Sequence, residues 1–436
     1  MTAVGKKRKP IGALCLCLVL ALLFSACAPV VADGSPRPPT PSELVAPPSL
    51  SAPTSTPVPT PTPEPDFSTP TVKIQMAGDI MLHIGPQRAA KTAEGYDFTP
   101  YFSLIAPYLD GDLTVCNMEA PVDAYGENQK TSSYPQFNVP YEILPALKGA
   151  GFNFLLTANN HAYDMRWAGL LATRRNIERA GLDFTGTFET QEQYDAPKIV
   201  AVNGLKVGIL SYSDADNGLS VLIPTEELPH AMRRFTSGSL DSLPDMAADI
   251  ANLRAAGAQF VIAALHWGAE YRNAPTDTQR DIARALCDSG ADVVMGGHSH
   301  CVQPIEWYTG PDGRESLILY SLGNFFADQI ALDPPQPKTQ YGMLISVSVR
   351  LDKAGALVWE GADYMPTLSY RYQDSASPTG TAYRLLPAPE YAEAETRPDV
   401  FATDAEWNKV KAAMAHVETI AGADIPVWAG GCGAEG

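Results

Sequence analysis

The sequence predicts a layered α/β fold, and three observations support this prediction. From about residue 71 onward, short apolar runs alternate with stretches of helical spacing. Two of the expected helices end at a glycine, Gly181 and Gly257, as helices commonly do. Five of the apolar runs end directly in Asp, Asn, Glu or His. Strands that alternate with helices indicate an α/β fold, in which ligands gather beyond the carboxyl ends of the strands.

The expected elements follow one another in a regular order. Apolar or alternating runs predict strands at residues 71–76, 113–116, 152–156, 207–212, 260–265, 291–295 and 317–322. Helical spacing covers residues 142–150, 166–180, 246–256 and 277–288. Asn203-Gly204, between two apolar runs, is typical of a hairpin turn. Further on, residues 370–372 and 383–387 are expected to form edge strands, and residues 406–420 a helix.

The residues that follow the strands are of the kinds that bind metal ions. They are Asp79, Glu119, Asn160, His266, His298 and His300. Each has an ordinary alternative: Asp79 as a turn residue, Asn160 as a helix cap, His266 as a hydrogen-bonded core histidine. Together, two carboxylates, an amide oxygen and three imidazoles form a ligand set for two neighbouring divalent ions. Because imidazole must be deprotonated to bind a metal, we expect occupancy to fall at acid pH.

The N-terminus indicates export. Residues 6–9 are basic, residues 11–24 are apolar, and small residues then lead to Cys27, which is the pattern of a secretory signal. Leu23-Phe24-Ser25-Ala26-Cys27 resembles a bacterial lipobox, in which cleavage leaves a lipidated cysteine. We therefore predict a lipoprotein signal over residues 1–27, with Cys27 anchoring the chain at the extracellular face of the cell membrane. The alternatives, a plain cleaved signal and an uncleaved anchor, also export the domain.

Composition constrains the rest of the chain beyond the signal. Residues 28–68 are mostly Pro, Ser, Thr and Ala, which predicts a disordered tether. Removing the four basic residues of the signal moves the net charge from −18 to −22, which argues against a nucleic-acid partner. The remaining cysteines lack CxxC or disulfide-framework spacing, so we expect them to be mostly buried thiols. They are Cys116, Cys287, Cys301 and Cys432.

The order of the strand-end motifs resembles that of the calcineurin-like metallophosphoesterases. These motifs are Gly78-Asp79, Asn117-Met118-Glu119, Asn159-Asn160-His161, His266-Trp267-Gly268 and Gly297-His298-Ser299-His300. The chain is more closely similar to the CapA family of capsule-synthesis proteins, which is associated with poly-γ-glutamate production. Additional motifs carry that similarity: Tyr96-Asp97-Phe98, the His-Trp-Gly-x-Glu-Tyr that ends at Tyr271, and Ser321-Leu322-Gly323-Asn324-Phe325.

The resemblance covers about residues 72–365 and has consequences for fold and site. It implies a metallophosphoesterase-like sandwich of two sheets flanked by helices over residues 69–365, on which a small appendage of residues 366–436 packs. Asp79 and His300 would bind one divalent ion, and Asn160, His266 and His298 a second, with Glu119 bridging them. The ions, one or two in number, would be Mn, Zn or Fe and would activate a water as the nucleophile.

Two further residues are expected to act on the substrate, and two depart from the phosphoesterase pattern. His161 would face the substrate and donate a proton, and Asp164 would orient its ring. Met81 stands where the pattern has a histidine, and the nearby His83 has the wrong spacing to replace it. Glu119 replaces the usual bridging aspartate. We therefore expect the ion at Asp79 and His300 to be held more loosely than the other.

Three hypotheses for function remain open from the sequence alone. The first is a metal-dependent hydrolase or transferase that acts on an anionic polymer, such as poly-γ-glutamate, during capsule biosynthesis or export, alongside other capsule-synthesis membrane proteins. The second is a non-catalytic accessory lipoprotein that binds and guides the polymer, and Met81 favours it. The third is an exported metallophosphatase. Because the chain is acidic, binding a polyanion requires the metals together with residues such as Arg88, Arg166 and Arg272 to form a local positive patch.

Overall fold

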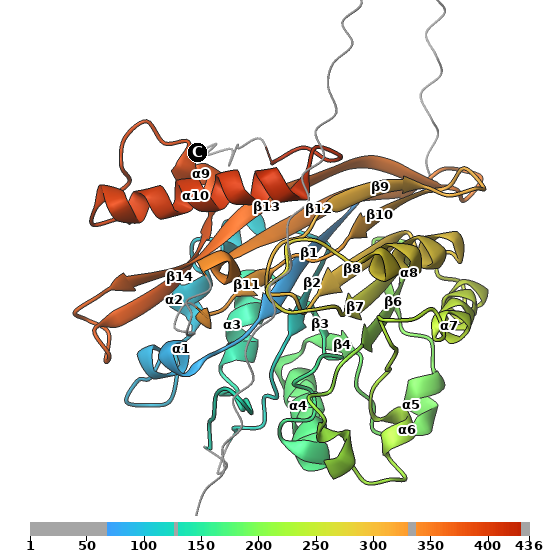
Figure 1. The fold of residues 1–436 in the computed structure, drawn as a ribbon, viewed down its shortest axis with the longest axis horizontal. Helices are drawn as coiled ribbons and strands as arrows, with labels where there is room; N and C mark the ends of the chain where they lie inside the picture. Colours follow the sequence, from blue (N-terminus) through green and yellow to red (C-terminus); the bar gives the residue numbers. More distant parts are fainter. Residues whose placement is uncertain (1–67, 126–129, 330–336, 429–436) are drawn as a thin grey trace, which may run out of the picture. The chain divides into compact units, whose positions relative to one another are not determined.

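Two β-sheets form the centre of the structure (Figure 1). The computed structural model describes residues 68–125, 130–329 and 337–428. The larger sheet has the order β14 (Thr381–Pro387), β13 (Leu357–Gln373), β12 (Tyr341–Leu351), β1 (Val72–Ile80), β2 (Leu113–Met118), β3 (Phe154–Leu156) and β4 (Asp183–Thr185), and β11 (Asn324–Phe326) also pairs with β1. The smaller sheet has the order β5 (Ile199–Val202), β6 (Leu205–Ser213), β7 (Phe260–His266), β8 (Val293–Gly297), β10 (Glu315–Leu319) and β9 (Ile305–Thr309).

Helices pack around the two sheets. They are α1 (Ile84–Ala89), α2 (Thr99–Phe102), α3 (Ile143–Ala150), α4 (Arg166–Ala180), α5 (Gln191–Asp195), α6 (Leu228–Ala231), α7 (Leu243–Ala255), α8 (Asp277–Asp288), α9 (Ala388–Ala392) and α10 (Asp404–Ala421). Helix α3 packs with the outer face of the larger sheet in one apolar cluster, and α7 and α8 pack with the outer face of the smaller sheet in another. The predicted sandwich of two sheets flanked by helices is confirmed.

The core between the sheets explains the long apolar runs of the sequence. In β7, Phe260, Ile262 and Ala264 belong to the cluster between the sheets, which also contains side chains of β1, β6 and β12. The alternate residues of β7 point the other way, into the cluster formed with α7 and α8. Because successive side chains of a strand point to opposite faces, a strand covered on both faces is apolar throughout.

Parallel pairing brings the carboxyl ends of the central strands to one edge. Strands β1, β2 and β3 are parallel neighbours in the larger sheet, and β6, β7 and β8 are parallel neighbours in the smaller one. Asp79 is level with Asn117 across β1 and β2, and His266 is level with Gly297 across β7 and β8. Residues that are distant in sequence therefore meet where these strands end.

The C-terminal residues continue the larger sheet. The boundary expected between residues 365 and 366 falls inside β13, which pairs with β12 and β14. Residues 370–372 lie in β13, which has a neighbour on each side, so the expectation of an edge strand is wrong for them; β14 is the edge. Helix α10 contributes Val410 and Ala413 to an apolar cluster with β13, β14 and Phe401.

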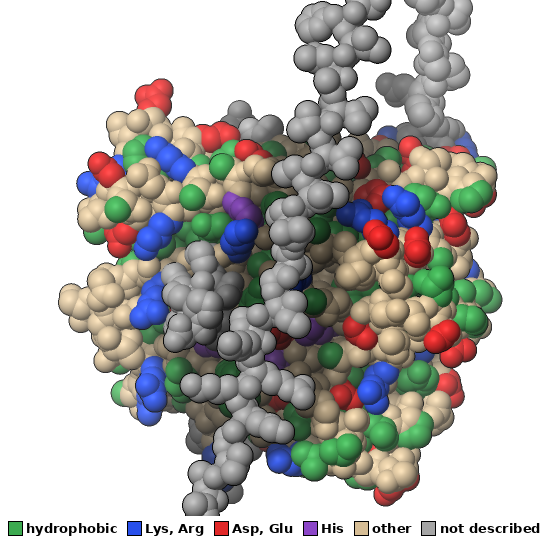
Figure 2. Space-filling view, in the orientation of Figure 1, with side chains coloured by type: hydrophobic (Ala, Val, Ile, Leu, Met, Phe, Trp, Pro, Cys, Tyr) green, Lys and Arg blue, Asp and Glu red, His purple; other side chains and the backbone are tan. Residues whose placement is uncertain are grey.

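Other expectations from the sequence have varied outcomes. Cys116, Cys287 and Cys301 are buried free thiols, as predicted. The signal, Cys27, Cys432 and nearly all of the tether lie outside the described residues. Within the described ranges, no helix is long and apolar enough to cross a membrane. On the uncovered part of the face in Figure 2, Lys and Arg side chains are scattered among acidic ones.

The close approach of β1 to Gly323 makes Gly78 a test of the fold. A Cβ at Gly78 would lie 1.9 Å from the carbonyl oxygen of Gly323, which accepts a hydrogen bond from the Asp79 amide. We expect Gly78→Ala to lower the free energy of unfolding by about 1 to 3 kcal/mol, as overpacking typically does. Gly149→Ala is the control, because a Cβ at this exposed position of α3 meets nothing within 4 Å and should stabilise the helix by about 0.8–1 kcal/mol. Urea denaturation of both variants measures the difference, and equal stabilities would contradict the packing described.

Candidate metal centre

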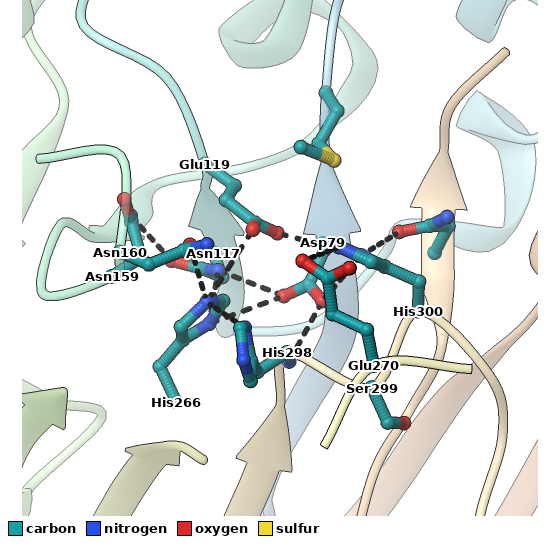
Figure 3. Close-up of polar contacts among 12 residues, drawn as sticks. Asp79, Asn117, Glu119, Asn159, Asn160, His266, Glu270, His298, Ser299 and His300 are labelled. Carbon is teal, nitrogen blue, oxygen red and sulfur yellow. Dashed lines mark hydrogen bonds and ion pairs between the residues drawn. The ribbon is translucent and has the colours of Figure 1, made fainter. Parts of the chain in front are cut away.

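All six predicted ligand residues lie together at the carboxyl edge of the two sheets (Figure 3). Asp79 is near the end of β1, Glu119 directly follows β2, and Asn160 lies in the turn after β3. His266 is the last residue of β7, and His298 and His300 follow β8. All six side chains are buried, and those of Asp79 and Glu119 have no exposed surface. The site therefore draws ligands from both sheets.

The first group of donor atoms surrounds the ring of His266. Its Nε2 atom lies 2.9 Å from Asn160 Oδ1, 3.1 Å from His298 Nδ1 and 3.4 Å from Glu119 Oε1. Two imidazole nitrogens, an amide oxygen and a carboxylate oxygen thus face a common point. Glu119, His266 and His298 have the mutual spacing of a metal-binding group.

The second group shares Glu119 with the first. His300 Nδ1 lies 3.7 Å from Asp79 Oδ2 and 3.8 Å from Glu119 Oε2. Asp79, Glu119 and His300 also have the spacing of a metal-binding group. This division into two groups, with Glu119 between them, is the one that the resemblance to the metallophosphoesterases implies.

The Glu119 carboxylate tests whether these residues suit a cation. Both of its oxygens are buried, and neither has a hydrogen-bond partner among the described residues. A buried charge without partners is costly, and buried carboxylates are normally paired or bound to metals. Divalent ions in the two groups would satisfy both oxygens. The donor set, with carboxylate, amide and imidazole ligands, fits such ions.

Burial sets the charges of the ligands in opposite directions. It lowers the pKa of His266 to about 4 and, together with the neighbouring His266, that of His298 to about 3. The pKa of His300 also lies well below its ordinary value. Conversely, burial raises the pKa of Glu119 to about 8, and burial together with the Glu119 charge raises that of Asp79 to about 7. At neutral pH the imidazoles are therefore neutral, as ligands must be, while the carboxyl groups retain protons.

The loop after β8 is held in an unusual backbone conformation. His298 has φ 81° and His300 has φ 55°, both in the left-handed region that non-glycine residues seldom adopt. A Cβ at Gly297 would lie 2.8 Å from Asp79 Oδ1, so glycine is needed for the close approach. The amide of His298 donates to Asp79 Oδ2 at 3.0 Å. Asp79 thus fixes the loop that carries both histidines.

His161 and Asp164 form a separate buried pair beside the ligands. Asp164 Oδ2 lies 2.7 Å from His161 Nδ1 and also accepts a hydrogen bond of 2.6 Å from the Phe137 amide. Burial alone would lower the pKa of His161, but the hydrogen bond to Asp164 and the charge of Glu119 outweigh it and raise that pKa. The imidazolium form is therefore more stable here than in an ordinary histidine, which is the direction that a proton donor requires.

Several asparagines at the site were not assigned a role from the sequence. Asn117 donates to Asp79 Oδ1 at 2.8 Å, and Asn159 holds Asn117 by donating to its Oδ1 at 3.1 Å. Asn324 Oδ1 lies 3.1 Å from His300 Nδ1. Their positions in the sequence could have indicated a role at the site. Asn117 and Asn159 also stand at strand ends, and Asn324 begins β11 directly after Gly323. These amides orient the ligands, as partners beyond the ligands commonly do in metal sites.

The fold and the site define a class: a two-sheet α/β protein with a buried candidate centre for divalent ions. Residues 73–329 match the family model described as bacterial capsule synthesis protein PGA_cap. The chain belongs to this family.

Two relatives and one solved structure illustrate the similarity. The chain is 31% identical over 261 residues to the capsule biosynthesis protein CapA of Bacillus anthracis, covering 58% of this chain and 59% of that protein. It is 31% identical over 268 residues to the PGA biosynthesis protein CapA of Bacillus subtilis (strain 168), covering 60% and 65%. The match thus spans less than two thirds of either relative. The sulfate thiohydrolase SoxB of Thermus thermophilus superposes with a TM-score of 0.36 and 12% identity, covering 79% of this chain and 60% of that one.

The buried carboxyl groups change the expected pH dependence of metal binding. Below about pH 8 an incoming ion must displace protons from Glu119, and below about pH 7 from Asp79 as well. We expect affinity for Mn²⁺ to fall with decreasing pH by up to about tenfold per pH unit for each proton displaced. The histidines add to this fall only near pH 4, because burial lowers the pKa of His266 to about 4. Calorimetry in buffers of different ionisation enthalpy counts the protons released, and pH-independent affinity without proton release would contradict this ordering.

Proposed function

We propose that this protein acts in the synthesis or export of capsule or poly-γ-glutamate as a divalent-metal-dependent hydrolase or transferase on an anionic polymer. In this proposal it is exported and held by a lipid at the extracellular face of the cell membrane. The observation that carries the proposal is the buried Glu119 carboxylate, which lies between two metal-binding groups and whose oxygens have no hydrogen-bond partner among the described residues. Membership of the capsule synthesis family supports the choice of process.

The proposed chemistry divides between bound ions and the chain. Divalent ions, when bound, would supply Lewis-acid activation and stabilise negative charge. His161 holds a proton for a leaving group, and Asp164 keeps its ring in one orientation through the 2.7 Å contact at Nδ1. Asn217 Nδ2 lies 3.5 Å from the same nitrogen and so adds a polar group beside the donor.

The polymer chemistry follows from the charge of the site. Neutral imidazoles leave the charge of bound divalent ions available to attract anionic groups. Arg88, Arg166 and Arg272 are all exposed, as a contribution to polymer binding requires. The basic side chains on the uncovered part of the face in Figure 2 are scattered and form no single patch. We therefore expect the anionic polymer to be attracted mainly by the metal ions of the centre.

A second candidate function is non-catalytic binding and guiding of the polymer. The observation that favours it is Met81, whose buried thioether stands where a metal ligand is expected. Thioethers are poor ligands for hard divalent ions. An incomplete centre would still attract anionic groups but would support little turnover.

His161→Asn separates the two candidates. Asn keeps polarity and nearly fills the space, so metal content and melting temperature should stay near wild type. On the catalytic proposal, loss of the proton donor should lower the rate by about 10²- to 10⁴-fold, and polymer production in cells should collapse. His416→Asn is the matched control, because this half-buried histidine of α10 is not among the predicted site residues. Normal production by His161→Asn with its metals in place would favour the binding function.

Cys27→Ala tests the proposed anchor. If the lipobox is processed, this variant should be released into the medium or remain unprocessed, because no acyl chains can be attached. Cys17→Ala, within the apolar run of the signal, should fractionate like wild type. Membrane fractionation and mass spectrometry of the mature N-terminus provide the measurement. Unchanged processing and membrane association of Cys27→Ala would rule out the lipoprotein.

A further inference from the structure

The metal group at Asp79 and His300 has fewer ligands than its partner group. Besides the shared Glu119, the first group has Asn160, His266 and His298, whereas the second has only Asp79 and His300. Met81 occupies the position expected for the missing ligand and is 2% exposed. Its sulfur accepts a contact of 3.8 Å from Gln329 Nε2, so it is directed toward residues behind the site.

The hydrogen bonds around Asn324 determine which nitrogen of His300 can bind a metal. Asn324 Nδ2 donates to the carbonyl oxygen of Thr339 at 2.9 Å, and this oxygen can only accept. The other amide atom facing His300 is therefore the oxygen Oδ1, 3.1 Å from Nδ1. Nδ1 must carry the proton, because an acceptor faces it. The lone pair of His300 is then on Nε2, so the ring would bind an ion through Nε2, although Nδ1 is the nitrogen for which the contacts with Asp79 and Glu119 are found.

Glu270 is a carboxylate that lies close to this nitrogen. Its Oε1 lies 4.0 Å from His300 Nε2, and in Figure 3 its carboxylate is directed toward the cluster. Two donors on one ion, each about 2.0 to 2.2 Å from it, lie at most about 4.4 Å apart. Glu270 is 41% exposed, so its side chain can adjust when an ion binds.

The backbone holds Glu270 over His300. The next residue, Tyr271, has φ 63°, in the left-handed region, and its amide donates to the carbonyl oxygen of Ser299 at 2.8 Å. The Tyr271 ring lies 6.0 Å from the ring of His300. A strained residue tied to the loop between the two metal-binding histidines is the kind of feature that occurs at functional sites. The end of β7 and the loop after it therefore lie beside both groups, through His266 and Glu270 respectively.

We propose that Glu270 is a ligand of the second metal site. It would take the place of the histidine that the metallophosphoesterase pattern has at the position of Met81. This inference rests on the proposed metal dependence. The second site then has three carboxylates and one imidazole, whereas the first has one carboxylate, one amide and two imidazoles. Carboxylate-rich sites suit Mn²⁺ better than nitrogen-rich ones do. The two sites therefore differ in metal preference.

Mn²⁺ binding to the purified chain tests the inference without any activity assay. Calorimetry counts the ions, and electron paramagnetic resonance distinguishes an exchange-coupled Mn²⁺ pair from a single ion. Wild type should bind two ions per chain and show coupling. Glu270→Gln should keep one ion and lose the coupling, with the second affinity weakened at least about 10- to 100-fold. Glu315→Gln, at the exposed start of β10, is the control and should resemble wild type.

A double variant tests whether Glu270→Gln loses the second ion because a ligand is missing or because the structure is disturbed. Met81→His combined with Glu270→Gln should regain the second ion and the coupling, because it restores an imidazole. Two ions bound by Glu270→Gln with wild-type affinity would overturn the assignment of Glu270 and leave the proposed function standing. A folded wild-type chain that binds one ion would also overturn it. Absence of any bound Mn²⁺ in wild type would remove both the inference and the metal-dependent function.

Discussion

The site depends on one electrostatic constraint, which is the complete burial of the Glu119 carboxylate. Neither of its oxygens has a hydrogen-bond partner among the described residues, and the Asp79 carboxylate is buried nearby. Burial raises the pKa of both carboxyl groups, and the charge of Glu119 raises that of Asp79 further. The surrounding imidazoles stay neutral and do not supply the missing charge. Bound divalent ions would compensate the buried carboxylates and join ligands from both sheets.

The scaffold is built to hold these ligands before any ion binds. Asp79 accepts hydrogen bonds from Asn117 in the same sheet and from the His298 amide after β8 in the other. His298 and His300 have left-handed backbone conformations, and Gly297 allows β8 to approach Asp79 closely. Preorganisation of this kind is typical of sites whose geometry matters to their function. His161 is held by a hydrogen bond to Asp164, which is not among the predicted metal ligands.

Much of the fold and site could be predicted from the sequence, because both depend on parallel strands. A strand that is covered on both faces is apolar throughout, so β7 and β8 can be recognised in the sequence as apolar runs. The residues that end or follow these runs are His266, His298 and His300, which are therefore predicted to be neighbours. Pairing between distant segments could not be predicted. The insertion of β12 between β1 and β13 leaves no local pattern, and neither does the placement of Asn324 beside His300. Glu270 was visible only as part of a motif, since its position over His300 depends on the left-handed turn at Tyr271. The expectation that metal binding near neutral pH displaces protons from carboxyl groups and not from imidazoles depends on how deeply these groups are buried. Sequence periodicity does not provide this information.

The central claim is that the buried cluster around Glu119 is a divalent metal centre. The most direct test is the metal content of the chain, purified at neutral pH without exposure to chelators and measured by inductively coupled plasma mass spectrometry. One to two divalent ions per folded chain are predicted, with the content reduced in a folded His266→Ala variant. A folded wild-type chain that contains no divalent ion, and takes up none when Mn²⁺, Zn²⁺ or Fe²⁺ is supplied, would contradict the account.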